Sequence, residues 1–173
     1  LELPTLEEDF NTLTQNDLFP FQAGIQAGVS SFMIGHLSVP AIDPSKTPAS
    51  LSKPVITDLL QQKMHFKGLV VSDALNMEAI TENYGKVEAA VKSFEAGCDI
   101  LLMPEDVPGA IQSIQEKVNA GAISVQELNN RCLKILKTKH KFIVKQQPKH
   151  TYTEEEKEFI KHQTFEKACT VLK

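Results

Sequence analysis

No apolar run in this sequence approaches the roughly 20 residues that a membrane-spanning helix needs, so we expect no such span. Basic residues are not in excess either, because 18 Lys and Arg stand against 22 Asp and Glu, for a net charge of -4. This balance lacks the basic footprint of a nucleic-acid-binding protein, and nucleic acid is not an expected partner. A charged and then apolar leader is also not visible. Since the chain begins at Leu1 in mid-pattern, that absence says nothing about export.

Cysteine is scarce, and its spacing fits no metal site. The number of cysteines is odd, and they lie far apart at unequal intervals, at Cys98, Cys132 and Cys169. There is no Cys-x-x-Cys, and no pair of histidines stands at metal-ligand spacing. We therefore expect all three cysteines to be small buried apolar residues, and we expect neither a metal nor a cofactor.

Cap residues divide much of the chain into helical segments. Thr5-Leu6-Glu7-Glu8 and Ser124-Val125-Gln126-Glu127 both fit the capping-box pattern of a helix start. Gly97 and Gly121 follow periodic segments, where glycine commonly ends a helix. One helix is predicted to open after Thr5, and others to cover about 18–27, 53–63, 86–96, 107–120, 124–139 and 153–172. A further helical segment after Asp73 is predicted to break around Tyr84-Gly85.

Short, nearly continuous apolar segments lie between the helices, at 29–34, 69–72 and 99–103. Such segments are typical of strands in a parallel sheet with helices on its outside, so the sequence predicts an α/β fold with these three strands adjacent and parallel. Three strands are too few for a complete (β/α)8 barrel, which needs eight strands and typically about 250 residues. The chain is therefore either a small open sheet or a piece of something larger.

A residue of interest follows each predicted strand or ends it. Asp73 comes directly after Leu69-Val70-Val71-Ser72, His36 follows the first strand, and Met103 ends the third. Taken alone, Asp73 is best explained as the N-cap of a helix near Met77, and the alternative is a catalytic acid at the mouth of an α/β fold. His36 alone would be a packed histidine, and Met103 a core or pocket-wall residue.

Three segments carry a family resemblance. MIGHLSVPAIDPSKTPASLS, KGLVVSDALNMEAI and AGCDILLMP, in that order, resemble the last three strands of the catalytic barrel of glycoside hydrolase family 3, with the β-N-acetylglucosaminidases nearest. The resemblance implies that residues 1–145 are the C-terminal part of a TIM (β/α)8 barrel. It also implies that residues 146–173, with KHQTFEKACTVLK, are a helical linker towards a second domain that this chain does not contain.

The resemblance also implies roles for residues at the strand ends. Asp73 matches the nucleophile of a retaining glycosidase, and His36 and Met103 match positions that line the sugar pocket. Asp43 matches a position that is often acidic, where stabilisation of the loop is the expected role. Relatives that act on β-glucosides tend to carry Trp after the nucleophile, whereas this chain has Ala74 there and no Trp anywhere. The resemblance thus favours a β-linked N-acetylglucosamine substrate, such as a peptidoglycan fragment, with a β-glucosidase-type activity as the alternative.

One family motif is missing. The family's acid/base histidine lies in a Lys-His-Phe-Pro-Gly-His-Gly loop, and LELPTLEEDF resembles the sequence that follows it. The expectation is a chain that carries the nucleophile without its proton donor and is inactive alone. Its expected partners are a carbohydrate substrate and either the missing N-terminal half of the barrel or a second copy of the chain. A catalytically inactive half-barrel that acts as a binding or assembly module is the remaining alternative.

Overall fold

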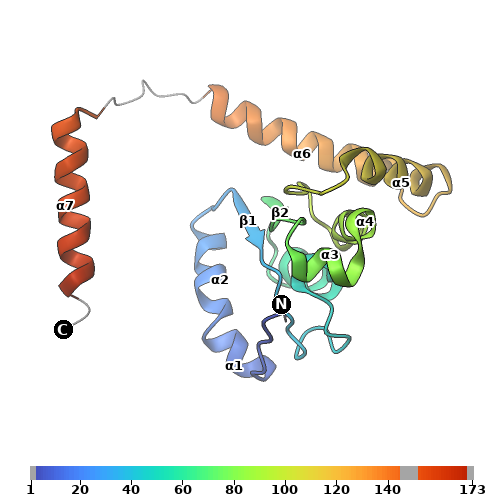
Figure 1. The fold of residues 1–173 in the computed structure, drawn as a ribbon, viewed down its shortest axis with the longest axis horizontal. Coiled ribbons are helices and arrows are strands. Elements are labelled where there is room, and N and C mark those ends of the chain that lie inside the picture. Colours follow the sequence, from blue (N-terminus) through green and yellow to red (C-terminus); the bar gives the residue numbers. More distant parts are fainter. Residues whose placement is uncertain (1–2, 145–151, 171–173) are drawn as a thin grey trace. The chain divides into compact units, whose positions relative to one another are not determined.

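The protein forms two units, Leu1–Lys139 and His140–Lys173, in a computed structural model that describes residues 3–144 and 152–170. Across those residues, no helix is both long and apolar enough to cross a bilayer. The elements follow one another in the order α1 (Phe10–Gln15), α2 (Leu18–Gln26), β1 (Ser31–Ile34), the 3-10 helix η1 (Ala49–Leu51), the π-helix η2 (Pro54–Lys63), β2 (Leu69–Ser72), α3 (Glu78–Tyr84), α4 (Lys86–Ala96), α5 (Val107–Asn119), α6 (Val125–Val144) and α7 (Glu154–Thr170) (Figure 1).

Strands β1 and β2 pair in parallel, as the sequence predicts. Ser31 lies opposite Leu69, and Ile34 lies opposite Ser72. The prediction of a third regular strand over 99–103 is wrong, because this segment joins β2 through a single parallel bridge between Ile100 and Val71. It nevertheless runs beside β2 on the side away from β1, so the expected order and direction of the three segments are confirmed.

The third segment is irregular because its hydrogen bonds do not follow a parallel ladder. The amides of Asp99 and Ile100 both donate to the carbonyl of Val70, at 2.8 and 3.1 Å. Further along, the amide of Leu102 donates to the Ser72 hydroxyl at 2.9 Å and not to a backbone carbonyl. A side chain thus replaces a main-chain acceptor at this end of the sheet.

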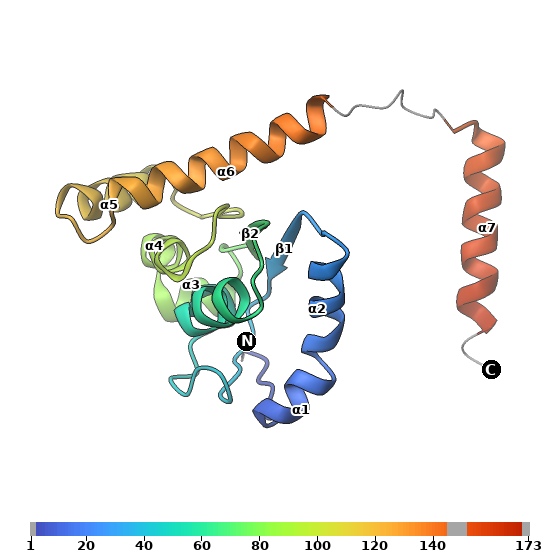
Figure 2. The same cartoon turned by 180° about the vertical axis from the view of Figure 1, so that it is seen from behind.

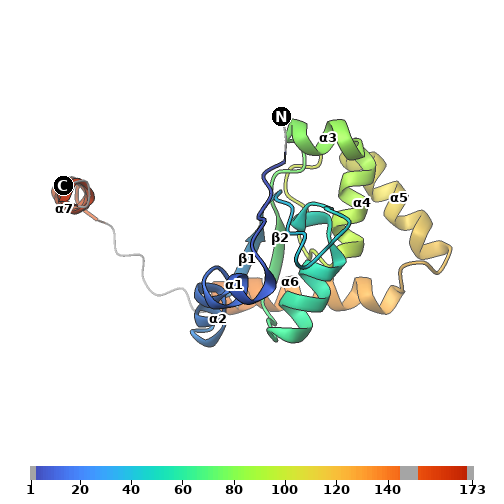
Figure 3. The same ribbon diagram turned by 90° about the horizontal axis from the view of Figure 1, so that it is seen from below.

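The core of the first unit lies on one face of the sheet. In Figures 1 and 2 the sheet lies between α2 on one side and α3 and α4 on the other, and Figure 3 shows β1 and β2 side by side. Val70 of β2 and Ile56 of η2 are fully buried, and Phe32 and Ile34 of β1 pack against the same cluster. Because side chains alternate along a strand, Met33 points to the opposite face, where it is 57% exposed. On that face Met33 is therefore an apolar side chain that this unit leaves largely exposed.

The first predicted helix start is wrong. Thr5 forms a parallel bridge with Ser38, and the Ser38 amide donates to the Pro4 carbonyl at 2.8 Å. Helix α1 begins only at Phe10, where the Asp9 side chain accepts hydrogen bonds from the amides of Asn11 and Thr12. No helix starts at Thr5 because the backbone around this residue forms its hydrogen bonds with the distant loop at Ser38.

The predicted helix boundaries at glycines are confirmed, whereas the predicted burial of the cysteines is confirmed only in part. Helix α4 ends at Gly97, which has a φ of 120°, and a glycine with a φ of 75° separates α3 from α4 at Gly85, both as predicted. Cys98 is buried, whereas Cys132 on α6 is exposed, so the expectation of burial is wrong for Cys132. The side chain of Cys169 lies outside the part of the chain that is described.

Candidate active site

Asp73 lies one residue past β2, at the carboxyl end of the sheet. Its amide donates to the carbonyl of Ile34 at 2.9 Å, which extends the pairing between the strands by one step. The residues on both sides are tied to the third segment, because the hydroxyl of buried Ser72 accepts from the Leu102 amide and the Leu75 amide donates to the Leu102 carbonyl at 2.9 Å. The backbone that carries Asp73 is therefore held between two neighbours.

The carboxylate of Asp73 is half-buried and does not cap a helix. Its Oδ1 accepts from the amide of Ala74 at 2.8 Å, while the N-cap of α3 is Met77. Strand alternation places Asp73 on the same face as Val71, which lies opposite Met33 in the register of the sheet. The acid therefore lies on the same face of the sheet as Met33, not on the face of Val70, Phe32 and Ile34 that packs in the core.

His36 is buried, with 5% of its surface exposed, and both of its ring nitrogens are occupied. Nδ1 lies 2.5 Å from the hydroxyl of Ser50, and Nε2 lies 3.0 Å from the carbonyl oxygen of Ala74. A carbonyl can only accept, so Nε2 carries a proton, and in a neutral ring Nδ1 then accepts from Ser50. The prediction that His36 lies near Asp73 agrees with the structure. Both ring nitrogens of His36, however, contact other groups of the protein and do not face the space at the strand ends.

Ser50 has no signal in the sequence that links it to this site. It is fully buried, in the middle of the short helix η1, and it lies 14 positions after the histidine that it contacts. Its place within the Thr47-Pro48-Ala49-Ser50 stretch indicates a turn, and only the folded loop brings the hydroxyl to His36.

Met103 lies just past Leu102, at the same end of the sheet. Its side chain is 57% exposed, so it is not a core residue. Its φ of 46° lies in the left-handed region, which a residue with a side chain seldom adopts, and the chain turns away from the sheet there. Met103 is thus placed where it can contact a ligand at the strand ends.

Asp43 organises the loop between β1 and η1, as expected. It accepts hydrogen bonds from the amide and hydroxyl of Ser45, at 3.1 and 2.6 Å, and from the hydroxyl of Ser52 at 2.6 Å. Burial alone would raise the pKa of the Asp43 carboxyl, but these hydrogen bonds outweigh it and hold the pKa below its usual value. The loop that carries His36 at one end and Ser50 near the other is therefore closed by an ionised carboxylate.

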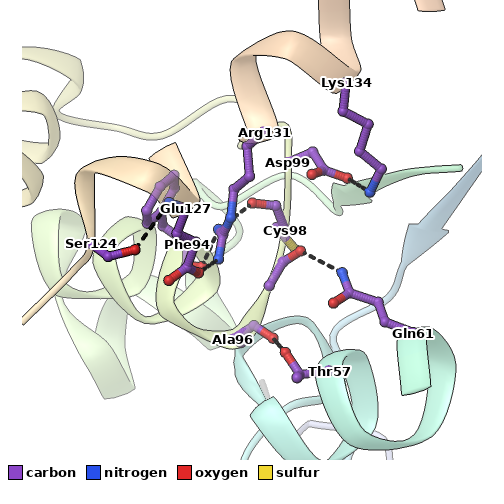
Figure 4. Close-up of polar contacts among 11 residues, drawn as sticks. Thr57, Gln61, Phe94, Ala96, Cys98, Asp99, Ser124, Glu127, Arg131 and Lys134 are labelled. Carbon is purple, nitrogen blue, oxygen red and sulfur yellow. Dashed lines mark hydrogen bonds and ion pairs between the residues drawn. The ribbon is translucent and has the colours of Figure 1, made fainter. Parts of the chain in front are cut away.

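A polar cavity of about 900 Å³ lies at the other end of the sheet. Asp99 helps to line it and accepts at its carboxylate from the amide of Val70, near the start of β2. Arg131, Lys134 and Gln61 reach into the same region, where their donors bond to carbonyls and carboxylates of the protein (Figure 4). The cavity is thus separated from Asp73 by the length of β2.

The acidic side chains that follow Asp73 most closely in the sequence lie on helix α3. Glu78 and Glu82 are exposed there, as on a solvated helix face. Within residues 3–144 and 152–170, no cluster of three or more His, Cys, Asp or Glu side chains is arranged to hold a metal ion.

Comparison with known proteins places this geometry in a family context. The model for the "Glycosyl hydrolase family 3 N terminal domain" matches residues 1–138. A β-hexosaminidase of Stenotrophomonas maltophilia (strain K279a) is 39% identical over 115 residues, which are 64% of this chain and 33% of that protein. β-Hexosaminidase A of Pseudoalteromonas piscicida is 35% identical over 113 residues, which are 59% of this chain and 19% of that protein.

A similar solved structure is the family 3 β-N-acetylglucosaminidase from Paenibacillus sp. str. FPU-7. The two superpose with a TM-score of 0.78 at 34% sequence identity, over 88% of this chain and 30% of that one. The chain thus spans about a third or less of the length of these relatives.

Proposed function

Because the chain belongs to glycoside hydrolase family 3, we propose that it is the C-terminal part of a (β/α)8 barrel in a retaining glycosidase that removes β-linked N-acetylglucosamine. The substrate proposal draws on relatives that are named β-hexosaminidase or β-N-acetylglucosaminidase. Peptidoglycan fragments or related glycosides are the proposed substrates. Residues 1–145 are the proposed barrel part, and residues 146–173, which include α7, are the proposed linker and connecting helix.

The placement of Asp73 carries this proposal. A nucleophile must be ionised, rigidly held and aimed into the pocket at the carboxyl ends of the strands. Asp73 stands at such an end, on a backbone tied on both sides, with one carboxylate oxygen bonded to the next amide. Its other oxygen, Oδ2, is the proposed attacking atom.

The proposed reaction has two steps. Asp73 forms a bond to the anomeric carbon of the sugar while the bond to the leaving oxygen breaks, and a general acid gives that oxygen a proton. Water then attacks the same carbon and releases the aspartate, with the former acid acting as base. We propose that the acid/base is a histidine in a part of the protein that this sequence does not include, as the resemblance implies.

The free edge of β1 and the exposed side chain of Met33 support the partial-barrel proposal. Strand β1 pairs only with β2 among the described residues, and Met33 leaves an apolar side chain in the open. Beyond the third segment lies an apolar groove of about 580 Å³, lined by Phe94, Leu101, Ile111, Ile114 and Val118, among others. Free strand edges and apolar grooves recruit partners. We propose that the missing N-terminal half, or a second copy, covers them, and a stable folded monomer of this chain in sedimentation at micromolar concentration contradicts this.

The test compares variants of the longer protein that also carries the histidine loop. Asp73→Ala should lower hydrolysis of an aryl β-N-acetylglucosaminide by several powers of ten, as is common for an essential catalytic group. Glu78→Gln, which changes an exposed carboxylate on α3, is the matched control and should retain activity. The 173-residue chain alone should be inactive, because loss of general acid help typically costs 10²–10⁴-fold.

Labelling identifies the nucleophile independently. A mechanism-based fluoro-sugar should attach to the peptide that contains Asp73, and labelling of another carboxylate overturns the assignment. Faster turnover of an aryl β-glucoside than of the N-acetylglucosaminide supports the β-glucosidase alternative. If the longer protein hydrolyses neither substrate but retains sugar binding, the inactive binding module is the better account.

A further inference from the structure

A chain of two buried hydrogen bonds ends on the residue that follows Asp73. The hydroxyl of Ser50 lies 2.5 Å from His36 Nδ1, and His36 Nε2 lies 3.0 Å from the carbonyl oxygen of Ala74. Ser50 is fully buried and His36 is 5% exposed, so water competes little with either bond. Low exposure makes an unpaired polar group costly, and both ring nitrogens are therefore committed to these partners.

The direction of each bond is set by chemistry. The Ala74 carbonyl has only lone pairs, so it requires a proton on Nε2. The neutral ring then offers a lone pair at Nδ1, and only a donor can face it there, which the Ser50 hydroxyl provides. The Ala74 carbonyl thus sets the tautomer, and the Ser50 hydroxyl, which can donate, satisfies Nδ1 in that tautomer and holds the ring in place.

Ala74 is held at both of its peptide groups. Its amide donates to Asp73 Oδ1 at 2.8 Å, and its carbonyl accepts from His36. A rotation of the Ala74 backbone would break one bond or both. The orientation of the Asp73 carboxylate is therefore coupled to the ring of His36 through a single residue.

We infer that His36 and Ser50 are positioning residues that orient the Asp73 carboxylate through Ala74. This inference rests on the proposed function of Asp73 as nucleophile. It differs from the role that the resemblance implies for His36, because here its ring nitrogens bind the protein and no sugar. The functional consequence is that loss of the hydrogen bonds from Ser50 through His36 to Ala74 slows attack by Asp73 and leaves sugar binding in place.

Kinetics of the longer protein test the inference. Ser50→Ala removes the hydroxyl, leaves buried Nδ1 of His36 without its partner so that the ring can shift, and should lower kcat about 10- to 100-fold, the scale expected for a misplaced reacting group. KM and the inhibition constant of N-acetylglucosamine should change by less than about twofold, since no sugar contact is lost. The control is Ser93→Ala, the same change at an equally buried serine on α4, which should leave kcat unaltered.

A second pair of variants covers the case in which Ser50→Ala does not fold. His36→Gln keeps an N–H donor that can reach the Ala74 carbonyl, and His36→Leu does not. His36→Gln should retain at least about tenfold more activity than His36→Leu if the donor matters in this way. Equal kcat in the two variants overturns the inference, and so does a rise in KM with kcat unchanged.

The tautomer gives a readout that does not depend on activity. Long-range ¹H–¹⁵N spectra should show His36 with its proton on Nε2, and Ser50→Ala should shift the Nδ1 resonance because its hydrogen bond is lost. A proton on Nδ1 in the unaltered protein overturns the inference. Full activity in Asp73→Ala refutes the assignment of Asp73 as nucleophile. If Asp73→Ala loses its activity but Ser50→Ala keeps full activity, only the role of Ser50 and His36 is refuted.

Discussion

Arg131 on α6 joins that helix to the end of α4, and its replacement should be among the costlier changes in the first unit. The side chain is 11% exposed, and one guanidinium nitrogen donates to the carbonyls of Phe94, at 2.5 Å, and Cys98, at 2.9 Å (Figure 4). The guanidinium also lies over the Phe94 ring, 4.1 Å from its centre, and pairs with Glu127. A cation at the carboxyl end of a helix is stabilising in addition, because the last carbonyls of α4 point there.

The expected cost of Arg131→Met follows from these contacts. Hydrogen bonds to a charged donor contribute roughly 1.5–3 kcal/mol each, and the bond to Phe94 counts at the low end because the Gly97 amide still reaches the same carbonyl. The ring contact adds about 0.5–1 kcal/mol. Since the Glu127 side chain is 48% exposed, its ion pair adds only about 0.3–0.5 kcal/mol. Methionine keeps much of the apolar contact, so no packing loss is added, and we expect a loss of about 4 kcal/mol in the free energy of unfolding.

Urea unfolding measures this loss, with circular dichroism at 222 nm as the signal because the chain has no Trp. Glu127→Gln is the matched control, since it removes only the exposed partner and should cost less than about 0.5 kcal/mol. Arg131→Lys should fall between the two, because lysine keeps the charge but not the planar fork that reaches both carbonyls. If Arg131→Met costs no more than Glu127→Gln, then the two carbonyl contacts contribute nothing and the reasoning is refuted.

Two further predictions follow from perturbed pKa values. The pKa of Asp43 is below its ordinary value of 3.8, so the folded chain binds a proton at this carboxylate less tightly than the unfolded chain does. The ionised carboxylate therefore stabilises the folded chain above pH 3.8, and this stabilisation is lost as the pH falls below that value. Asp43→Asn should therefore flatten the acid limb of the urea midpoint plotted against pH, and an unchanged limb contradicts this. Burial raises the pKa of the Cys98 thiol to about 11, so iodoacetamide at pH 8 should label exposed Cys132 in the native protein and Cys98 only in urea. Equal native labelling of both residues in peptide mapping speaks against the buried thiol.

Local chemistry explains where prediction from the sequence works. Strand β2, the helix end at Gly97 and the break at Gly85 all depend on neighbours within a few positions, such as an apolar run or a glycine with a positive φ. Asp73 belongs to the same group, since its place at the end of β2 can be read from the order of residues. The failure at Thr5 marks the limit, because a bridge to Ser38 lies 33 positions away in the chain.

Thus the sequence by itself determined the parallel order of the segments and the acid at the strand end. Only the tertiary structure decided what surrounds that acid. The His36 ring turns inward because the Ala74 carbonyl, 38 positions away, and the buried Ser50 hydroxyl, 14 positions away, offer it partners. No local pattern encodes such contacts, because buried polar groups pair with whichever donor or acceptor the folded chain brings within reach.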